Sequence, residues 1–274
     1  NAEGLSEQLS NYVGANLAEQ MAQQDRQPKP DLMDVPFNQL GQEEADAIRD
    51  EMKRLAAKLR SRASLRQRRA KDGTPDTRKT MRASLKYGGV PLELKYRKRH
   101  VKPRLVLICD ISTSMRYCAE FLLTLIYELQ DQVAKTNSFV FISDIRDISM
   151  VFNECEPARA VERVLTENRP GYYNTDLGSS LESFKKDHMG LITRKTTVII
   201  LGDGRNNHNN PRTDIAQELM RKSRRLLWFN PEHPSQWGTG DSDMLQYAPV
   251  SNGVYRVSNL RELAAAVDKI LTDG

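Results

Sequence analysis

The sequence predicts an α/β fold: a doubly wound, mostly parallel sheet with helices on both faces, preceded by a basic, partly helical N-terminal extension. The main observation is that, from about residue 102 onward, short runs rich in β-branched residues alternate with longer amphipathic helical patterns. Strands that alternate with helices form βαβ units, which place the strands in parallel. We therefore expect two parts, an extension over 1–101 and a globular domain over 102–274.

Six short apolar segments are expected to form the strands of the sheet. Their central members, such as Thr-Thr-Val-Ile-Ile-Leu at 196–201, are apolar without alternation, which is typical of strands buried on both faces. The expected strands are 104–109, 138–143, 148–152, 196–201, 226–229 and 254–257.

Helical periodicity appears between these strands and also upstream of them. In the extension, Ile48, Met52, Leu55 and Leu59 lie at positions i, i+4, i+7 and i+11, which makes one apolar stripe. Pro157 favours the start of a helix, because proline is well tolerated at the first helical position. The expected helices are 43–65, 76–86, 115–134, 157–166, 177–186, 211–224 and 260–271, with a short strand at 91–98.

The formal net charge of +5 conceals a strong asymmetry along the chain. Residues 49–104 hold 20 Lys and Arg against 5 Asp and Glu, whereas the rest of the chain holds 21 against 31. Such a basic arm can bind nucleic acid, an acidic partner protein or the acidic domain of its own chain. Only Tyr87 and Tyr96 are available there to stack on bases. Nucleic-acid binding through 49–104 is therefore kept only as the alternative function, and contact of the arm with a protein surface fits the residues better than contact with nucleic acid.

Several classes of protein do not fit the sequence. No run approaches the roughly 18 apolar residues of a membrane helix, and residues 1–24 lack the apolar region of a signal peptide. Cys109, Cys118 and Cys155 are odd in number and without CxxC spacing, which favours reduced thiols in a cytoplasmic protein. The motifs GxxxxGK(S/T), GxSxG and HExxH are absent, so no catalytic activity is expected. A haloacid-dehalogenase-like phosphatase would need a second Asp where Ser112 stands.

Three polar clusters follow separate predicted strands or loops, and all their candidate ligands are oxygens. Asp110, Ser112 and Ser114 follow the first strand, Thr175 lies in a later loop, and Asp203 follows the fourth strand between two glycines. The carboxyl ends of adjacent strands in a doubly wound sheet converge on one crevice. Oxygen-only ligands suit a hard divalent cation, Mg²⁺ first, with Mn²⁺ or Ca²⁺ as alternatives. The Asp-x-Ser-x-Ser segment by itself is equally compatible with a simple helix cap.

These five positions resemble the von Willebrand factor A (VWA) domain with its metal-ion-dependent adhesion site, over about residues 102–274. The resemblance implies that Ser112, Ser114 and Thr175 contact the metal, while Asp110 and Asp203 act through water. It also implies an open coordination position that an Asp or Glu of a partner fills. This is binding chemistry, which requires neither a nucleophile nor a general base.

Upstream, the run from Arg78 through Gly88-Gly89 to Pro91, and the basic segment that leads to Arg104, resemble the bacterial CoxE-like VWA proteins. This resemblance implies a partner of the MoxR-type AAA+ ATPase class and an acidic client protein. The implied role is an adaptor, chaperone-like, in cofactor maturation, metal insertion or activation of a client enzyme.

The sequence departs from the family pattern in two places. Thr113 stands where Gly is frequent, and the threonine loop reads Tyr-Tyr-Asn-Thr instead of a Gly-rich run. Neither change removes an oxygen ligand. Around the site, we expect contacts with the partner from four side chains: Tyr172, Tyr173, Asp176 and His208.

Overall fold

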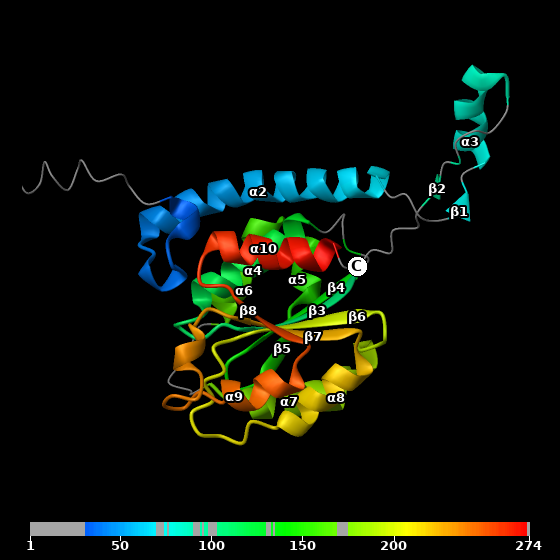
Figure 1. Cartoon of the computed structure of the whole chain (residues 1–274). Helices are drawn as coiled ribbons and strands as arrows, with labels where there is room; N and C mark the ends of the chain where they lie inside the picture. Colours follow the sequence, from blue (N-terminus) through cyan, green and yellow to red (C-terminus); the bar gives the residue numbers. More distant parts are fainter. Residues whose placement is uncertain are drawn as a thin grey trace, which may run out of the picture.

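The computed structural model of the chain describes residues 31–69, 74–75, 77–89, 94, 96–97, 103–129, 133, 135–168 and 175–272. Its centre is a six-stranded sheet in the order β5-β4-β3-β6-β7-β8, parallel except for the antiparallel pair β4–β5 (Figure 1). The strands are β3 (Arg104–Asp110), β4 (Lys135–Phe141), β5 (Ile145–Asp147), β6 (Thr196–Leu201), β7 (Arg225–Asn230) and β8 (Gly253–Arg256).

Helices cover both faces of this sheet, which confirms the predicted fold class (Figure 1). One face carries α4 (Arg116–Glu128), α5 (Ser149–Glu154), α6 (Pro157–Glu167) and α10 (Leu260–Thr272). The other carries α7 (Leu177–His188), α8 (Thr213–Lys222) and α9 (Met244–Tyr247). The 3-10 turns in this part are η5 (Met189–Leu191), η6 (Pro234–Gln236) and η7 (Ala248–Val250). Side chains of β3 alternate between the two cores, because successive residues of a strand point to opposite faces.

One predicted strand is wrong. Residues 148–152 do not extend the sheet: β5 lies earlier, at Ile145–Asp147, and helix α5 begins at Ser149. Ile148 and Phe152 are both buried, at a spacing of four residues that also fits one face of a helix. Asp147 accepts a hydrogen bond from the Ser149 amide at 2.8 Å, which starts the turn. A short apolar run does not distinguish a strand from a helix by itself.

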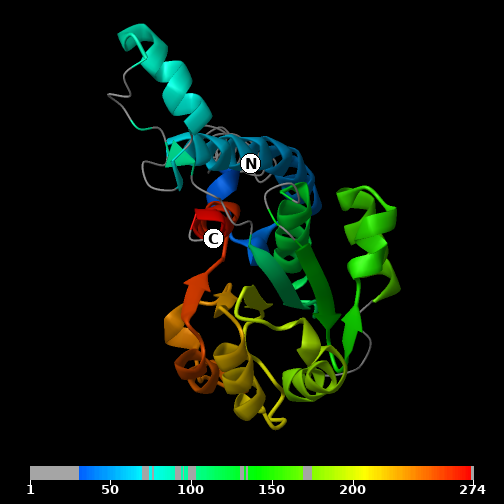
Figure 2. The same ribbon diagram turned by 90° about the vertical axis from the view of Figure 1, so that its right-hand side faces the viewer.

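Part of the N-terminal extension packs into the core of the domain. The turns η1 (Leu32–Asp34) and η2 (Phe37–Gln39) lead into α2 (Gln42–Arg69), which lies alongside α10 and α4 (Figure 2). The Phe37 ring lies 5.2 Å from the ring of Phe121 in α4. Of the predicted apolar stripe, Ile48, Met52 and Leu59 are buried. They belong to the same hydrophobic cluster as the buried residues of α4 and α10.

Truncation of this stripe is expected to destabilise the whole domain. Ile48→Ala removes a fully buried side chain and should lower the free energy of unfolding by about 3 kcal/mol, the usual cost of such a cavity. Chemical denaturation of the metal-free protein measures it, with Lys53→Ala, on the exposed face of the same helix, as control. Equal stability of the two variants would show that α2 does not contribute to the core.

A small arm projects from the far end of α2 and stands clear of the sheet and its helices (Figures 1 and 2). It consists of β1 (Thr74–Pro75), α3 (Thr77–Ser84), η3 (Leu85–Tyr87) and β2 (Tyr96–Arg97). Its base is closed by antiparallel pairing of β1 with β2. Among the described residues, no helix combines the length and the apolar character needed to cross a membrane.

Candidate metal centre

Two buried carboxylates meet at the carboxyl ends of the neighbouring strands β3 and β6. Asp110 is the last residue of β3 and is 2% exposed, and Asp203, two residues after β6, is 5% exposed. Because β3 and β6 pair in parallel with Cys109 opposite Leu201, both carboxylates emerge at the same edge of the sheet. The predicted convergence of these two side chains is therefore present.

Burial disfavours the charged form of both carboxylates. Burial, and after it the charge of Asp203, raises the pKa of Asp110 to about 7. Burial also raises the pKa of Asp203, although the Arg205 amide, which donates to its Oδ1 at 3.0 Å, acts in the opposite direction. Within the described part of the chain neither carboxylate forms a salt bridge. A pair of this kind is costly unless a cation lies between the two groups.

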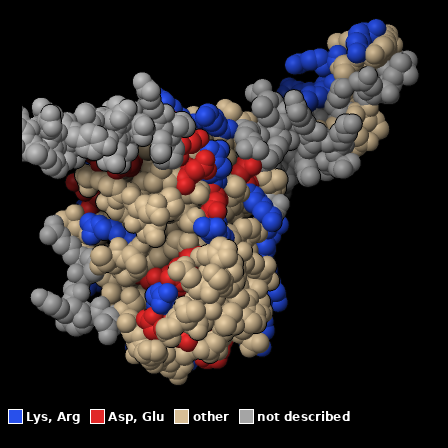
Figure 3. All heavy atoms as spheres, turned by 60° about the vertical axis from the view of Figure 1, so that its left-hand side comes forward, with Lys and Arg blue, Asp and Glu red and all other residues tan. Residues whose placement is uncertain are grey.

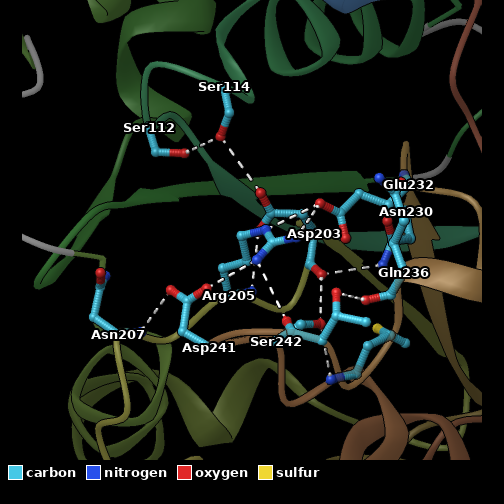
Figure 4. A network of polar contacts seen from close by, with 12 residues as sticks. Ser112, Ser114, Asp203, Arg205, Asn207, Asn230, Glu232, Gln236, Asp241 and Ser242 are labelled. Atoms are coloured by element: carbon cyan, nitrogen blue, oxygen red, sulfur yellow. Dashed lines mark hydrogen bonds and ion pairs between the residues drawn. The ribbon is translucent and has the colours of Figure 1, made fainter.

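The predicted serine hydroxyls line the same place. Ser112 Oγ lies 3.3 Å from Ser114 Oγ, and Ser114 Oγ lies 3.4 Å from Asp203 Oδ2 (Figure 4). The Ser112 amide donates to Asp110 Oδ1 at 2.7 Å, so that this short turn holds both the carboxylate and the hydroxyls. The alternative interpretation, in which this segment only caps the next helix, is not observed. Helix α4 begins at Arg116, and its N-cap residue, Met115, forms no side-chain hydrogen bond.

Thr175 is tied through backbone contacts to the loop after β6 and to the end of β4. Its carbonyl accepts a hydrogen bond of 2.9 Å from the Asn207 side chain, in the loop after β6. The next residue, Asp176, donates its amide to the Ile142 carbonyl at 2.7 Å and caps α7 by accepting from the Ser179 amide at 2.8 Å. Among the described residues, the Thr175 hydroxyl has no hydrogen bond to the other four predicted ligands.

Buried side chains of β7 donate hydrogen bonds to the backbone around Asp203. The Trp228 indole donates to the Gly202 carbonyl at 2.8 Å, and the Asn230 amide group donates to the Asp203 carbonyl at 3.3 Å. Gly204 has a φ of 76°, and a Cβ there would lie 3.2 Å from Met244. Both the left-handed conformation and the close contact require glycine at this position.

Arg205 anchors the loop that follows Asp203. Its guanidinium pairs with Glu232 at 2.8 Å and with Asp241 at 2.9 Å (Figure 4). These carboxylates raise the pKa of Arg205. Burial would raise the pKa of Asp241, but the hydrogen bond and the charge of Arg205 outweigh this effect, and the pKa of Asp241 is lowered. Both of these partners pair with the cation, so Arg205 positions the loop, and its charge only partly offsets the raised pKa of Asp203.

The four predicted partner contacts have different outcomes. Tyr172 and Tyr173 lie outside the described residues. Asp176 is described, and its side chain serves as the cap of α7. His208 is exposed in the loop after Asp203 and has a φ of 60°.

Asn206 is a structural residue that the sequence did not reveal. It is fully buried, accepts from the Leu177 amide at 2.9 Å and donates to the Asn209 carbonyl at 2.9 Å. It therefore ties the start of α7 to the loop after β6, and so fixes Thr175 relative to Asp203. The polar run Arg205-Asn-Asn-His208 signals a loop, but the partner of Asn206 is 29 residues away and cannot be read from it.

The residues present fit a hard divalent cation. The donors are two carboxylates and hydroxyl groups, with no nitrogen or sulfur ligand, as Mg²⁺, Mn²⁺ and Ca²⁺ prefer. Nowhere in the described part of the chain is a group of three or more His, Cys, Asp or Glu side chains placed to hold a metal, so this site depends on hydroxyls beside its two carboxylates. Cys109 and Cys118 are buried, which raises the pKa of both thiols and keeps them from acting as ligands.

The strand order and the oxygen-rich cluster at the ends of β3 and β6 define a VWA-type domain. A comparison with protein families agrees: residues 48–266 match the family described as VWA domain containing CoxE-like protein. The match covers most of the chain, and the protein belongs to this family. A comparison with curated proteins found no match.

Solved structures of other VWA-type proteins are similar at low identity. BatB from Bacteroides thetaiotaomicron is 14% identical with a TM-score of 0.45, over 62% of this chain and 98% of that chain. Proximal thread matrix protein 1 from the mussel byssus, with a zinc-occupied MIDAS motif, is 15% identical with a TM-score of 0.44, over 62% and 47%. Manganese-loaded TRAP from Plasmodium vivax is 15% identical with a TM-score of 0.42, over 63% and 74%.

Proposed function

We propose that this protein is a metal-dependent protein-binding adaptor that captures an acidic residue of a client protein. The observation that carries the proposal is the buried pair Asp110–Asp203, two carboxylates that form no salt bridge with any described residue and lie beside the hydroxyls of Ser112 and Ser114. Such a cluster is poorly stable as a purely structural element, because both charges are desolvated and repel each other. It becomes favourable when a divalent cation is bound.

Within this proposal, the hydroxyls of Ser112, Ser114 and Thr175 and the carboxylates of Asp110 and Asp203 would hold the cation. Mg²⁺ is the first candidate, with Mn²⁺ and Ca²⁺ as alternatives, because few charged ligands and several hydroxyls suit a small hard ion. When bound, the ion supplies a positive charge at the protein surface that attracts a carboxylate. Ser114 is exposed and Ser112 half-buried, so a partner can approach from their side.

The second proposed partner is an AAA+ ATPase of the MoxR type, which would supply energy by hydrolysing ATP. The proposed process is cofactor maturation, metal insertion or activation of the client enzyme. Membership of the CoxE-like family supports this assignment. The protein itself is proposed to have no catalytic activity, because the site offers oxygen ligands and no nucleophile with a neighbouring base.

The position of α4 provides a route from the site into the domain. Ser114 is followed by Met115, which is fully buried, and α4 starts at the next residue. A displacement of the serine turn would therefore act on α4, which packs against α2, α6 and α10. We infer that force from the ATPase cycle passes through these packed helices.

The test is capture of a MoxR-type ATPase and client by the tagged full chain, with Mg²⁺ and with EDTA. We expect Ser112→Ala/Ser114→Ala to reduce client capture in Mg²⁺ by about tenfold or more, because a charge-assisted contact contributes roughly 1.5–3 kcal/mol. The matched control is Ser61→Ala, which removes an exposed hydroxyl from α2, away from the site.

Undiminished capture by the serine variant, or in EDTA, would contradict the metal-dependent contact. Recovery of nucleic acid with a steep salt dependence, insensitive to EDTA, would instead identify the basic segment 49–104 as the functional element.

A further inference from the structure

The projecting arm carries an inverted amphipathic helix. Helices of folded proteins normally bury their large apolar side chains and expose their polar ones. In α3 the buried side chains are Thr80 at 8% and Ser84 at 4%, whereas Met81 is 73% exposed and Leu85, which follows α3, is 72% exposed. The hydroxyl residues lie one helical turn apart, and so do the two apolar residues, so that they form two separate faces.

Exposed apolar side chains concentrate on this arm. In the described part of the chain, seven large hydrophobic residues are exposed, and five of them belong to the arm or its immediate surroundings: Met81, Leu85, Tyr87, Leu94 and Tyr96. The other two, Met150 and Leu245, are isolated on the body. Exposed apolar residues are usually scattered singly over a protein surface. Their concentration on the arm therefore indicates a site that binds another molecule.

The same face is positively charged. Residues 77–89 contain four basic side chains, Arg78, Lys79, Arg82 and Lys86, and no acidic one, a net charge of +4. By helical spacing, Arg78 and Arg82 lie three residues before Met81 and Leu85, on the same side of the helix. The space-filling view shows basic side chains gathered on the arm where it projects from the body (Figure 3).

We propose that the projecting arm is a docking element for a partner protein whose surface has an apolar recess bordered by acidic residues. Met81 and Leu85 enter the recess, and Arg78 and Arg82 meet its acidic rim. Phosphate groups of a nucleic acid offer no place for the two apolar side chains, and an apolar stripe of two residues is short for insertion into a membrane surface. This interface is independent of the metal centre, so it provides a second point of contact for an adaptor.

Site-specific photo-crosslinking in cells of the source organism tests the proposal. The full chain carries benzoylphenylalanine at position 81 or 85, and matched controls carry it at 150 or 245, where the apolar side chains are also exposed, at 68% and 60%. We expect one protein adduct from 81 and 85, about tenfold stronger than from the controls, joined to a partner peptide rich in Asp and Glu. Arg78→Glu/Arg82→Glu should reduce this adduct about tenfold, while Asp110→Asn should leave it unchanged.

Other outcomes overturn the proposal. Equal crosslinking from all four positions would mean that the arm has no special contact. An adduct with lipid or nucleic acid, or with a second copy of this chain, would assign the face to a different occupant. An adduct that persists after the charge reversal would remove the acidic rim from the interface. The substitutions on the arm and at 150 and 245 lie on exposed positions, whereas Asp110 is buried, and thermal unfolding of each purified variant verifies that the fold is retained.

Discussion

Gly178→Ala is expected to displace the start of α7 and with it Thr175. A Cβ atom at this position would lie 1.8 Å from the carbonyl oxygen of Asn210 and 3.0 Å from its carbon. Both are backbone atoms, so no rotation of a side chain can relieve the overlap. Either α7 or the loop after β6 must move, and these are the two segments that Asn206 joins through the Leu177 amide.

The expected result of this substitution is a loss of stability of about 1–3 kcal/mol, the usual cost of forcing extra volume into a packed contact. Cation binding should weaken as well, because Thr175 loses its position relative to Asp203. Denaturation and calorimetric titration with Mg²⁺ measure the two effects. Gly190→Ala is the matched control, since a Cβ there meets no atom within 4 Å and the backbone does not require glycine. Unchanged Mg²⁺ affinity in Gly178→Ala would show that Thr175 does not contribute to the site.

Asp110→Asn is expected to stabilise the metal-free protein and to abolish its stabilisation by Mg²⁺. Asparagine keeps an oxygen that can accept from the Ser112 amide, but it removes one of two buried, mutually repelling charges. The gain at pH 8 should be on the order of 2 kcal/mol. In the wild type, Mg²⁺ raises stability because it binds only the folded state, and the variant should lose this increase.

The effect of Asp110 on stability depends on pH with a definite sign. Its pKa of about 7 in the folded protein lies above its ordinary value of 3.8, so the native state holds the proton more tightly than the unfolded state. The stability of the metal-free wild type should therefore fall as pH rises from about 4 to about 7, and Asp110→Asn should show a smaller fall. Thermal unfolding in EDTA across this range measures it, with Asp187→Asn, an exposed carboxylate, as control. A steeper fall in Asp110→Asn than in the wild type would contradict the assignment.

The elements of the sheet were predictable because each buried strand is a compact apolar run. The segment 196–201 forms β6 with the same bounds, and the predicted helix at 260–271 is α10 with one additional residue. The prediction failed at 148–152, where Ile148 and Phe152 fit either periodicity. The predicted helix 115–134 ends at Glu128, earlier than its apolar pattern suggested.

The sequence by itself determined the fold class and the oxygen chemistry of the candidate site, because both follow from local patterns. Alternation of strands and helices predicts a parallel sheet. Parallel strands end at the same edge, so Asp110 at the end of β3 and Asp203 after β6 come together there. Only the tertiary structure decided the protonation behaviour of Asp110 and the position of the Thr175 backbone at that edge. The raised pKa of Asp110 depends on burial and on Asp203, and the position of Thr175 depends on Asn206 and Asn207. The same holds for the arm, because a helical pattern alone does not say which of its faces the chain covers, and here Thr80 and Ser84 are buried while Met81 is exposed.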